Sequence, residues 1–168
     1  MRDHPAEWSE DRLIRECQLR RERRSGPGGQ HRNKVETAVV IVHSSSGISA
    51  EANERRSQGE NRQMALFRLR LRLAVELRCE TALDAPPSSL WKSRVRKGKI
   101  AVNQAHADFP SLLAEGLDYL AAADWDAKLA AESLSCSTTQ LVRFLKDEPA
   151  AFQRLNQRRS ERGLRPLT

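Results

Sequence analysis

The chain has 168 residues, a mass of 19.0 kDa, a formal net charge of +7 and a pI of about 9.9. Its content of 39% hydrophobic and 30% charged residues excludes collagen-like, membrane-spanning and fully disordered chains. Residues 1–100 hold 21 Lys and Arg against 13 Asp and Glu, whereas residues 101–168 hold 8 against 9, so the basic surplus lies in the first part and indicates a polyanionic partner.

The N-terminus and the cysteines bear on the cellular compartment. Residues 1–13 contain several acids and no apolar run, which argues against a signal or transit peptide. Cys17, Cys79 and Cys136 are widely spaced, and no Cys/His cluster has zinc-binding spacing. We therefore expect a cytoplasmic monomer with free thiols, no metal, no cofactor and no membrane partner.

The first elements in the chain predict a small sheet. Residues 6–16 have the pattern of a short helix, and residues 17–24 alternate as an exposed strand. The glycine-rich stretch 25–30 fits no regular element. The β-branched run 38–43 and the alternating run 48–52, joined by a Ser-Gly turn, predict a β-hairpin.

A long helix follows the hairpin. Residues 61–81 contain no Gly or Pro, and Met64, Phe67 and Leu71 lie near one helical stripe. A second set of apolar residues lies alongside it: Leu66, Leu69, Leu73 and Leu77. A helix of this length must pack on the small sheet. The sequence therefore predicts an α+β domain over residues 1–84.

A basic segment, residues 85–105, comes next. It begins with a proline pair and carries five cations within eight positions: Lys92, Arg94, Arg96, Lys97 and Lys99. Its position suggests a linker and its charge suggests a phosphate-binding arm, and both interpretations stay open.

Residues 106–168 are predicted to be a small all-helical segment. Its four helices are expected at 110–123, 126–134, 138–146 and 149–162. Asp124 is the expected cap of the second helix, Ser137 or Thr138 that of the third, and Pro149 suits the first turn of the fourth.

The second and third of these helices also resemble a helix-turn-helix. The residues that would meet a nucleic-acid groove are Thr138, Thr139, Gln140 and Arg143. The alternative is a compact helical hairpin in a small bundle. This alternative is favoured because residues 106–148 are net acidic and would repel phosphate.

The glycine-rich loop carries residues suited to catalysis. Gly26, Gly28 and Gly29 surround Pro27 and let the backbone approach a substrate closely. Gln30 is neutral and no general base, but its amide can hold a water molecule and its backbone N–H can face a developing oxyanion. By itself, such a loop is better explained as a flexible turn.

Two residue clusters in order along the chain resemble the catalytic domain of class I peptide chain release factors. They also resemble the short, codon-independent peptidyl-tRNA hydrolases that rescue stalled ribosomes. The family motif Gly-Gly-Gln is matched by residues 28–30, and the resemblance covers residues 10–80. The family's second cluster is matched after the hairpin by Arg56, Ser57, Gln58 and Asn61.

The resemblance implies hydrolysis of the ester that joins a nascent peptide to the 3′-terminal ribose of P-site tRNA. Gly28 and Gly29 would set the loop conformation. The Gln30 backbone N–H would stabilise the leaving 3′-oxygen or the oxyanion, and its side chain would orient water. Proton transfer would fall to the tRNA ribose and the ribosome.

The implied partners are the ribosome, through large-subunit rRNA at the peptidyl-transferase centre, the P-site peptidyl-tRNA and the mRNA channel. The candidate RNA-binding residues are Arg20, Arg21, Arg23, Arg24, Arg32, Lys34, Arg56, Lys92, Arg94, Arg96, Lys97, Lys99, Arg158 and Arg159. The candidate loop-supporting residues are Ser25, Gly26, Pro27, His31, Asn33, Ser57 and Gln58. In one departure, Arg32 stands where the family commonly has Val, so a charge replaces an apolar contact.

The expected type is a codon-independent rescue factor, because the chain has no room before Cys17 for a stop-codon-reading domain. The Arg-rich stretch 156–166 is a candidate contact with the mRNA channel or rRNA. Two other functions stay open: a non-catalytic ribosome- or RNA-binding factor that retains the fold, and a DNA-binding regulator, which rests only on the helix-turn-helix pattern.

Overall fold

Two compact units make up the part of the chain that the computed structural model describes, residues 3–22 and 38–168. The sheet unit is Trp8–Leu73, and the helical unit combines Met1–Glu7 with Ala74–Thr168. The chain therefore starts in the helical unit, leaves it and returns. This division differs from the predicted boundary after residue 84, and it assigns the first seven residues to the C-terminal part.

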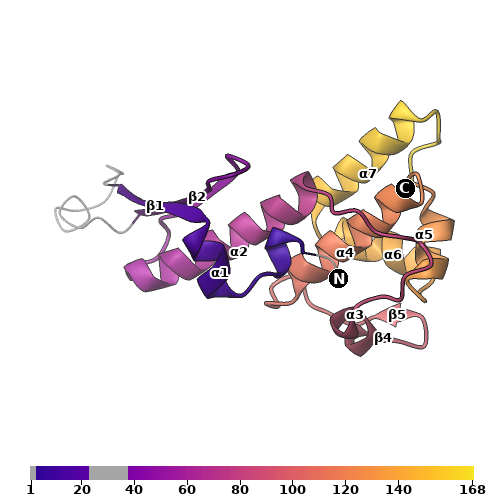
Figure 1. Cartoon of the computed structure of the whole chain (residues 1–168), viewed down its shortest axis with the longest axis horizontal. Helices are drawn as coiled ribbons and strands as arrows, with labels where there is room; N and C mark the ends of the chain where they lie inside the picture. Colours follow the sequence, from indigo (N-terminus) through magenta and orange to yellow (C-terminus); the bar gives the residue numbers. More distant parts are fainter. Residues whose placement is uncertain (1–2, 23–37) are drawn as a thin grey trace. The chain divides into compact units, whose positions relative to one another are not determined.

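A three-stranded antiparallel sheet and a long helix form the sheet unit (Figure 1). The strand order is β1-β2-β3, and the register of the first pair runs from Cys17 opposite His43 to Glu22 opposite Ala38. The elements are α1 (Glu10–Arg15), β1 (Cys17–Glu22), β2 (Ala38–His43), β3 (Ser49–Ala52) and α2 (Gln58–Glu76), whose last residues belong to the helical unit. The predicted α+β class is confirmed.

The core of the sheet unit lies between the buried faces of β2 and α2. Val39 and Ile41 of β2 are buried, as the alternation of a one-sided strand requires. On α2 the buried leucines are Leu66, Leu69 and Leu73, at the i, i+3 and i+7 spacing of one helical face. The predicted stripe of Met64, Phe67 and Leu71 is only half-buried.

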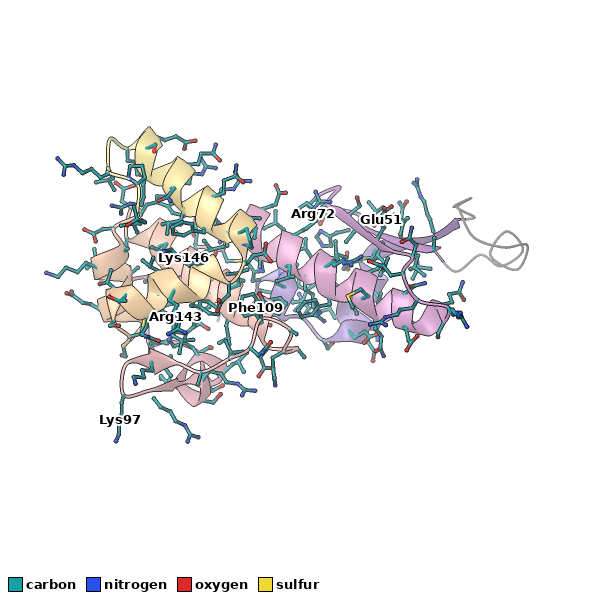
Figure 2. All side chains as sticks on the ribbon, turned by 180° about the vertical axis from the view of Figure 1, so that it is seen from behind. Glu51, Arg72, Lys97, Phe109, Arg143 and Lys146 are labelled. Carbon is teal, nitrogen blue, oxygen red and sulfur yellow. The ribbon has the colours of Figure 1, made fainter. Side chains whose placement is uncertain are left out.

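Arginines of α2 cover the open edge of the sheet. Arg68 donates from Nη1 to the carbonyl oxygen of Glu51 at 2.8 Å and also reaches the Glu54 carboxylate. Arg72, one turn further on, donates to the carbonyl oxygen of Ser49 (Figure 2). Because β3 is an edge strand, these bonds occupy carbonyls that no strand pairs.

The helical unit is built around α4, whose residues from Leu112 to Leu120 are all buried. Its elements are a 3-10 turn (Pro5–Glu7), α3 (Ser89–Arg94), β4 (Val95–Arg96), β5 (Lys99–Ile100), α4 (Phe109–Ala122), α5 (Ala127–Ser133), α6 (Thr138–Lys146) and α7 (Pro149–Glu161). All four predicted C-terminal helices are present. Within the described residues, no helix is both long and apolar enough to cross a membrane.

The segment predicted as a linker, residues 85–105, is folded into α3 and the β4–β5 hairpin. Trp91 of α3 is 1% exposed, and its indole N–H donates to the carbonyl oxygen of Leu134 at 2.9 Å. Its ring also meets Phe144 of α6 edge-on, at 6.0 Å between centroids. A buried aromatic anchor of this kind holds the segment on the helical unit.

The cap of α5 also differs from the prediction. Asp126, and not Asp124, accepts from the backbone N–H groups of Lys128 and Leu129, at 2.8 and 3.2 Å. Asp124 lies before the cap with φ of +50° and pairs with Arg162. At α6 the structure selects Ser137, whose Oγ accepts from the Gln140 N–H at 3.2 Å.

Candidate functional site

Strands β1 and β2 hold the two ends of the glycine-rich segment together. Because Glu22 lies opposite Ala38, residues 23–37 connect adjacent ends of two antiparallel strands. The predicted catalytic residues, Gly28, Gly29 and Gln30, lie in this segment, outside the described residues. The other predicted residues outside them are Arg23, Arg24, Ser25, Gly26, Pro27, His31, Arg32, Asn33 and Lys34.

The second motif cluster begins helix α2. Ser57 precedes the first helical residue, and its Oγ accepts from the Glu60 N–H at 3.4 Å, while its carbonyl oxygen accepts from the Asn61 N–H at 3.1 Å. The sequence Ser-Gln-Gly-Glu is thus a capping box by spacing, and this explains why α2 begins at Gln58, three residues before the predicted start. Ser57 is placed as a helix-starting residue and not as a nucleophile.

Asn61 fixes the turn that leads into α2. Its side chain is fully buried, and its amide both accepts from the Arg55 N–H and donates to the Arg55 carbonyl oxygen, each at 2.9 Å. Two bonds to one residue hold the backbone next to Arg56, which is exposed. The sequence marked Asn61 as part of a motif but did not indicate this role, which needs the tertiary fold.

A pocket of about 370 Å³ lies between the sheet and the start of α2. It is lined by Leu19, Val39, Gln58, Gly59 and Arg62. Val39 follows Ala38, the residue at which β2 leaves the glycine-rich segment. The pocket therefore brings the second motif cluster close to the strand end that carries the first.

The described residues that line this pocket supply a cation, an amide and apolar groups, with no carboxylate and no imidazole among them. Such a set can bind phosphate or ribose hydroxyls but cannot supply a general acid/base pair. On the neighbouring strand β1, Arg20 is exposed opposite Val40, and Arg21 lies opposite Val39. The described part of the site thus presents the cations Arg20 and Arg62 and no acid/base pair.

The predicted RNA-binding residues of the helical unit fall into two groups. Lys92, Arg96, Lys97 and Lys99 are exposed on α3 and the hairpin. The others are engaged within the unit: Arg94 pairs with Asp108 at 2.5 Å, Arg158 pairs with Glu161 at 3.0 Å, and Arg159 donates to the carbonyl oxygens of Trp125 and Arg165 at 2.6 and 2.9 Å.

One side-chain cluster has the residue types of a metal site. Ligand atoms of His4, Cys79 and Asp118 lie within 4.8 Å of one another in the helical unit. Both imidazole nitrogens of His4 are engaged, however: Nδ1 accepts from the Ala6 N–H at 3.1 Å, and Nε2 donates to the Leu77 carbonyl oxygen at 3.2 Å. An imidazole without an available lone pair does not ligate a metal, so the cluster serves packing.

Two of the three cysteine thiols, those of Cys17 and Cys136, have a raised pKa and stay protonated. Burial raises the pKa of Cys136 to about 11 and also raises the pKa of Cys17, and no two of the three cysteines form a disulfide. A thiol with a raised pKa is a poor nucleophile, which fits the expected idle role.

Comparisons with known proteins agree with the two motif clusters. The model of the RF-1 domain matches residues 13–107. The chain is 40% identical over 88 residues to peptide chain release factor 1 of Verminephrobacter eiseniae and 45% identical over 88 residues to that of Acidiphilium cryptum, in each case over 52% of this chain and 24% of the relative. It is 49% identical over 61 residues to the mitochondrial peptide chain release factor 1-like protein of Rattus norvegicus, over 36% of this chain and 16% of the relative. The chain thus matches at most a quarter of the length of these relatives.

Proposed function

Because the chain belongs to the RF-1 domain family, we propose that it hydrolyses the ester bond of peptidyl-tRNA on the ribosome and releases the nascent peptide. The observation that carries this proposal is the order and placement of the two motif clusters. Residues 28–30 belong to the segment of the sequence that joins the paired strands β1 and β2, and the Arg56-Ser57-Gln58 cluster leads into α2 beside the same strands.

In the proposed mechanism the protein positions groups and the substrate moves the protons. Gly28 and Gly29 let the backbone come close to the ester, and the Gln30 backbone N–H stabilises the negative charge that develops on oxygen. The Gln30 side chain orients the attacking water. The tRNA ribose and the ribosome carry the proton, which is consistent with a described pocket that offers no acid/base pair.

We further propose the codon-independent, rescue type of release. The support is the part of the chain that follows the RF-1 match: residues 108–168 fold as helices α4 to α7 of the helical unit. Its partners would be large-subunit rRNA, P-site peptidyl-tRNA and the mRNA channel, in the cytoplasm and as a monomer.

The test is release of formyl-methionine from ribosomes that carry initiator tRNA in the P site. Three complexes are compared: mRNA truncated after the P-site codon, a stop codon in the A site and a sense codon in the A site. We expect release from the truncated complex, with no gain from a stop codon. Release that requires a stop codon would contradict the rescue type.

Two variants test the catalytic loop. We expect Gly29→Ala to slow release about a hundredfold, because the added methyl group disturbs the loop that presents the oxyanion-stabilising N–H. Gln30→Ala keeps that N–H but loses the amide that orients water, and it should also release more slowly. Ribosome pelleting should stay unchanged for both variants. Gln63→Ala, an exposed glutamine on α2, is the matched control and should release at the normal rate. Normal release by the loop variants would remove the catalytic role, and binding without any release by the unmodified protein would select the non-catalytic ribosome-binding alternative.

A further inference from the structure

The β4–β5 hairpin gathers positive charge without compensation. Residues 85–105 contain five Lys and Arg and no Asp or Glu. Arg94 is paired with Asp108, which leaves Lys92, Arg96, Lys97 and Lys99. All four are exposed, and none forms an ion pair with any residue in the described part of the chain. We call these four residues the basic hairpin surface.

Other arginines of the helical unit are treated differently by the fold. Most of them bind an acid or a backbone carbonyl oxygen within the unit: Arg78, Arg94, Arg154, Arg158, Arg159 and Arg162. The basic hairpin surface therefore differs from the rest of the helical unit, where most arginines are already bound. Its four cations lie close together in the sequence, are not neutralised by acids of the unit and can bind an anionic partner.

Two features of the hairpin tip are unfavourable for folding: a left-handed backbone conformation and a pair of like charges. Lys97 and Gly98 are the central residues of a two-residue turn and have φ of +50° and +74°, a left-handed conformation that a lysine seldom adopts. Arg96 and Lys99 lie directly opposite each other across the strands, and like charges in this position repel. Residues that bear strain at one place are a recognised sign of function.

Hydrogen bonds and a buried tryptophan hold the backbone of the hairpin on the helical unit, and this fixes the positions from which its cations extend. The Gly98 carbonyl oxygen accepts from the N–H of Ser137, the cap of α6, at 3.2 Å. The Arg94 carbonyl oxygen accepts from the Ala101 N–H at 2.8 Å, and buried Trp91 anchors α3. Figure 2 shows Lys97 projecting from the hairpin tip and Arg143, also exposed, on neighbouring α6.

We propose that the basic hairpin surface is a second RNA-binding site, which grips the phosphate backbone of an RNA duplex. Three exposed cations around the tip of a short hairpin, Arg96, Lys97 and Lys99, can contact several phosphates of one strand, whereas a small anion would need only one of them. It reads charge and shape, because lysines contact phosphate as point charges and carry no base code. That this duplex is a helix of rRNA rests on the proposed function.

The test uses an RNA duplex of about 16 base pairs, the length that a double-stranded RNA module spans, and a DNA duplex of matching sequence. Binding of the full chain is measured by fluorescence anisotropy across a salt series. For Lys97→Glu/Lys99→Glu we expect at least a tenfold weaker RNA affinity. The slope of log affinity against log salt should fall in magnitude by about 2, as the loss of two phosphate contacts predicts.

Two further variants serve as controls. One tests whether net charge alone explains the loss of affinity, and the other tests whether a change in stability explains it. Arg15→Glu/Lys128→Glu changes the net charge equally at exposed sites elsewhere and should leave affinity within twofold. Lys97→Asn removes one cation but suits the left-handed turn, so it should melt no lower than the unmodified chain while binding RNA more weakly. Equal weakening by both double variants, or normal binding by the hairpin variants, would overturn the proposal. Tighter binding of the DNA duplex would overturn the assignment to RNA.

The peptide-release assay separates this proposal from the proposed function. At saturating concentration, Lys97→Glu/Lys99→Glu should reach the normal release rate but require more protein to do so. Gln30→Ala should bind the RNA duplex normally and fail in release. If Lys97→Glu/Lys99→Glu loses duplex binding but keeps a normal concentration dependence of release, the assignment of the duplex to rRNA is refuted and the proposed function stands.

Discussion

At the residue scale, His43 is a titratable group buried in the sheet unit. It ends β2 with 2% exposure, its Nδ1 lies 2.8 Å from Ser46 Oγ, and its ring centroid lies 6.0 Å from that of Trp8. Burial lowers the pKa of this imidazole below 6.5. The folded protein therefore keeps His43 neutral at a pH where the unfolded chain would already bind a proton.

This sets the pH dependence of stability that His43 contributes. A folded pKa below the unfolded value means that the contribution is complete above about pH 6.5 and is lost as the pH falls through that value. We expect the stability difference between the unmodified chain and His43→Gln to shrink between pH 7.5 and pH 5, measured by urea unfolding. Other titrating groups cancel in the comparison, so a difference that is constant with pH would contradict the prediction.

At the element scale, α2 shows how sequence periodicity can mislead. From Phe67 to Leu73 apolar residues alternate with Arg68, Arg70 and Arg72, which is the period of a strand. In the helix this alternation puts Leu69 and Leu73 on the buried face, and Arg68 and Arg72 on the face that holds β3. The helix and its two apolar stripes could be predicted from the sequence, but not that the stripe of Leu69 and Leu73 is the buried one.

The Asn61 clamp gives a prediction for the start of the same helix. Asn61→Ala removes the side chain that holds the backbone N–H and carbonyl of Arg55, so the loss of two hydrogen bonds should lower the free energy of unfolding by about 1–3 kcal/mol. Asn53→Ala, at an exposed position in the same turn, is the control and should change it by less than about 0.5 kcal/mol. Urea unfolding measures both, and equal effects would refute the clamp.

At the scale of the whole molecule, the Arg-rich C-terminal stretch is part of the fold. Ala151 and Leu155 of α7 are fully buried, and the Asn156 amide holds the backbone of Leu167 with two bonds, at 2.7 and 3.0 Å. Several of its arginines bind groups within the helical unit, as described above. A deletion of residues 150–168 would therefore test the fold of that unit as well as its charge.

We expect this deletion to destabilise the helical unit by at least about 3 kcal/mol, the cost of losing one buried leucine. Thermal melting followed by tryptophan fluorescence reports it, because Trp91 and Trp125 are buried in this unit. Arg165→Gln, which removes an exposed tail cation, should melt normally. A deletion variant that melts like the full chain would show that the stretch is dispensable for folding.

Local patterns and tertiary contacts account for different parts of the structure. Strand β2 and the C-terminal helices could be predicted because β-branched runs, caps and Pro149 act within a few residues. The division of the chain could not, since the composition of 85–105 suggests a linker until Trp91 is seen to be buried. Likewise, residues 28–30 were recognised from sequence alone, whereas the pocket beside Val39 depends on strands and a helix meeting.

Because the helical unit combines residues 1–7 with residues 74–168, the two units can fold at different times during synthesis. All the strand pairings and capping bonds of the sheet unit join residues within 8–73, so they can form as soon as that stretch has been synthesised. Residues 4–6 cannot form their contacts so early. The His4 ring hydrogen-bonds to the carbonyl oxygen of Leu77, and the Ala6 carbonyl oxygen accepts from the hydroxyl of Ser111, 105 positions further along the chain. During translation, residues 4–6 are therefore synthesised before the sheet unit but find their partners after it.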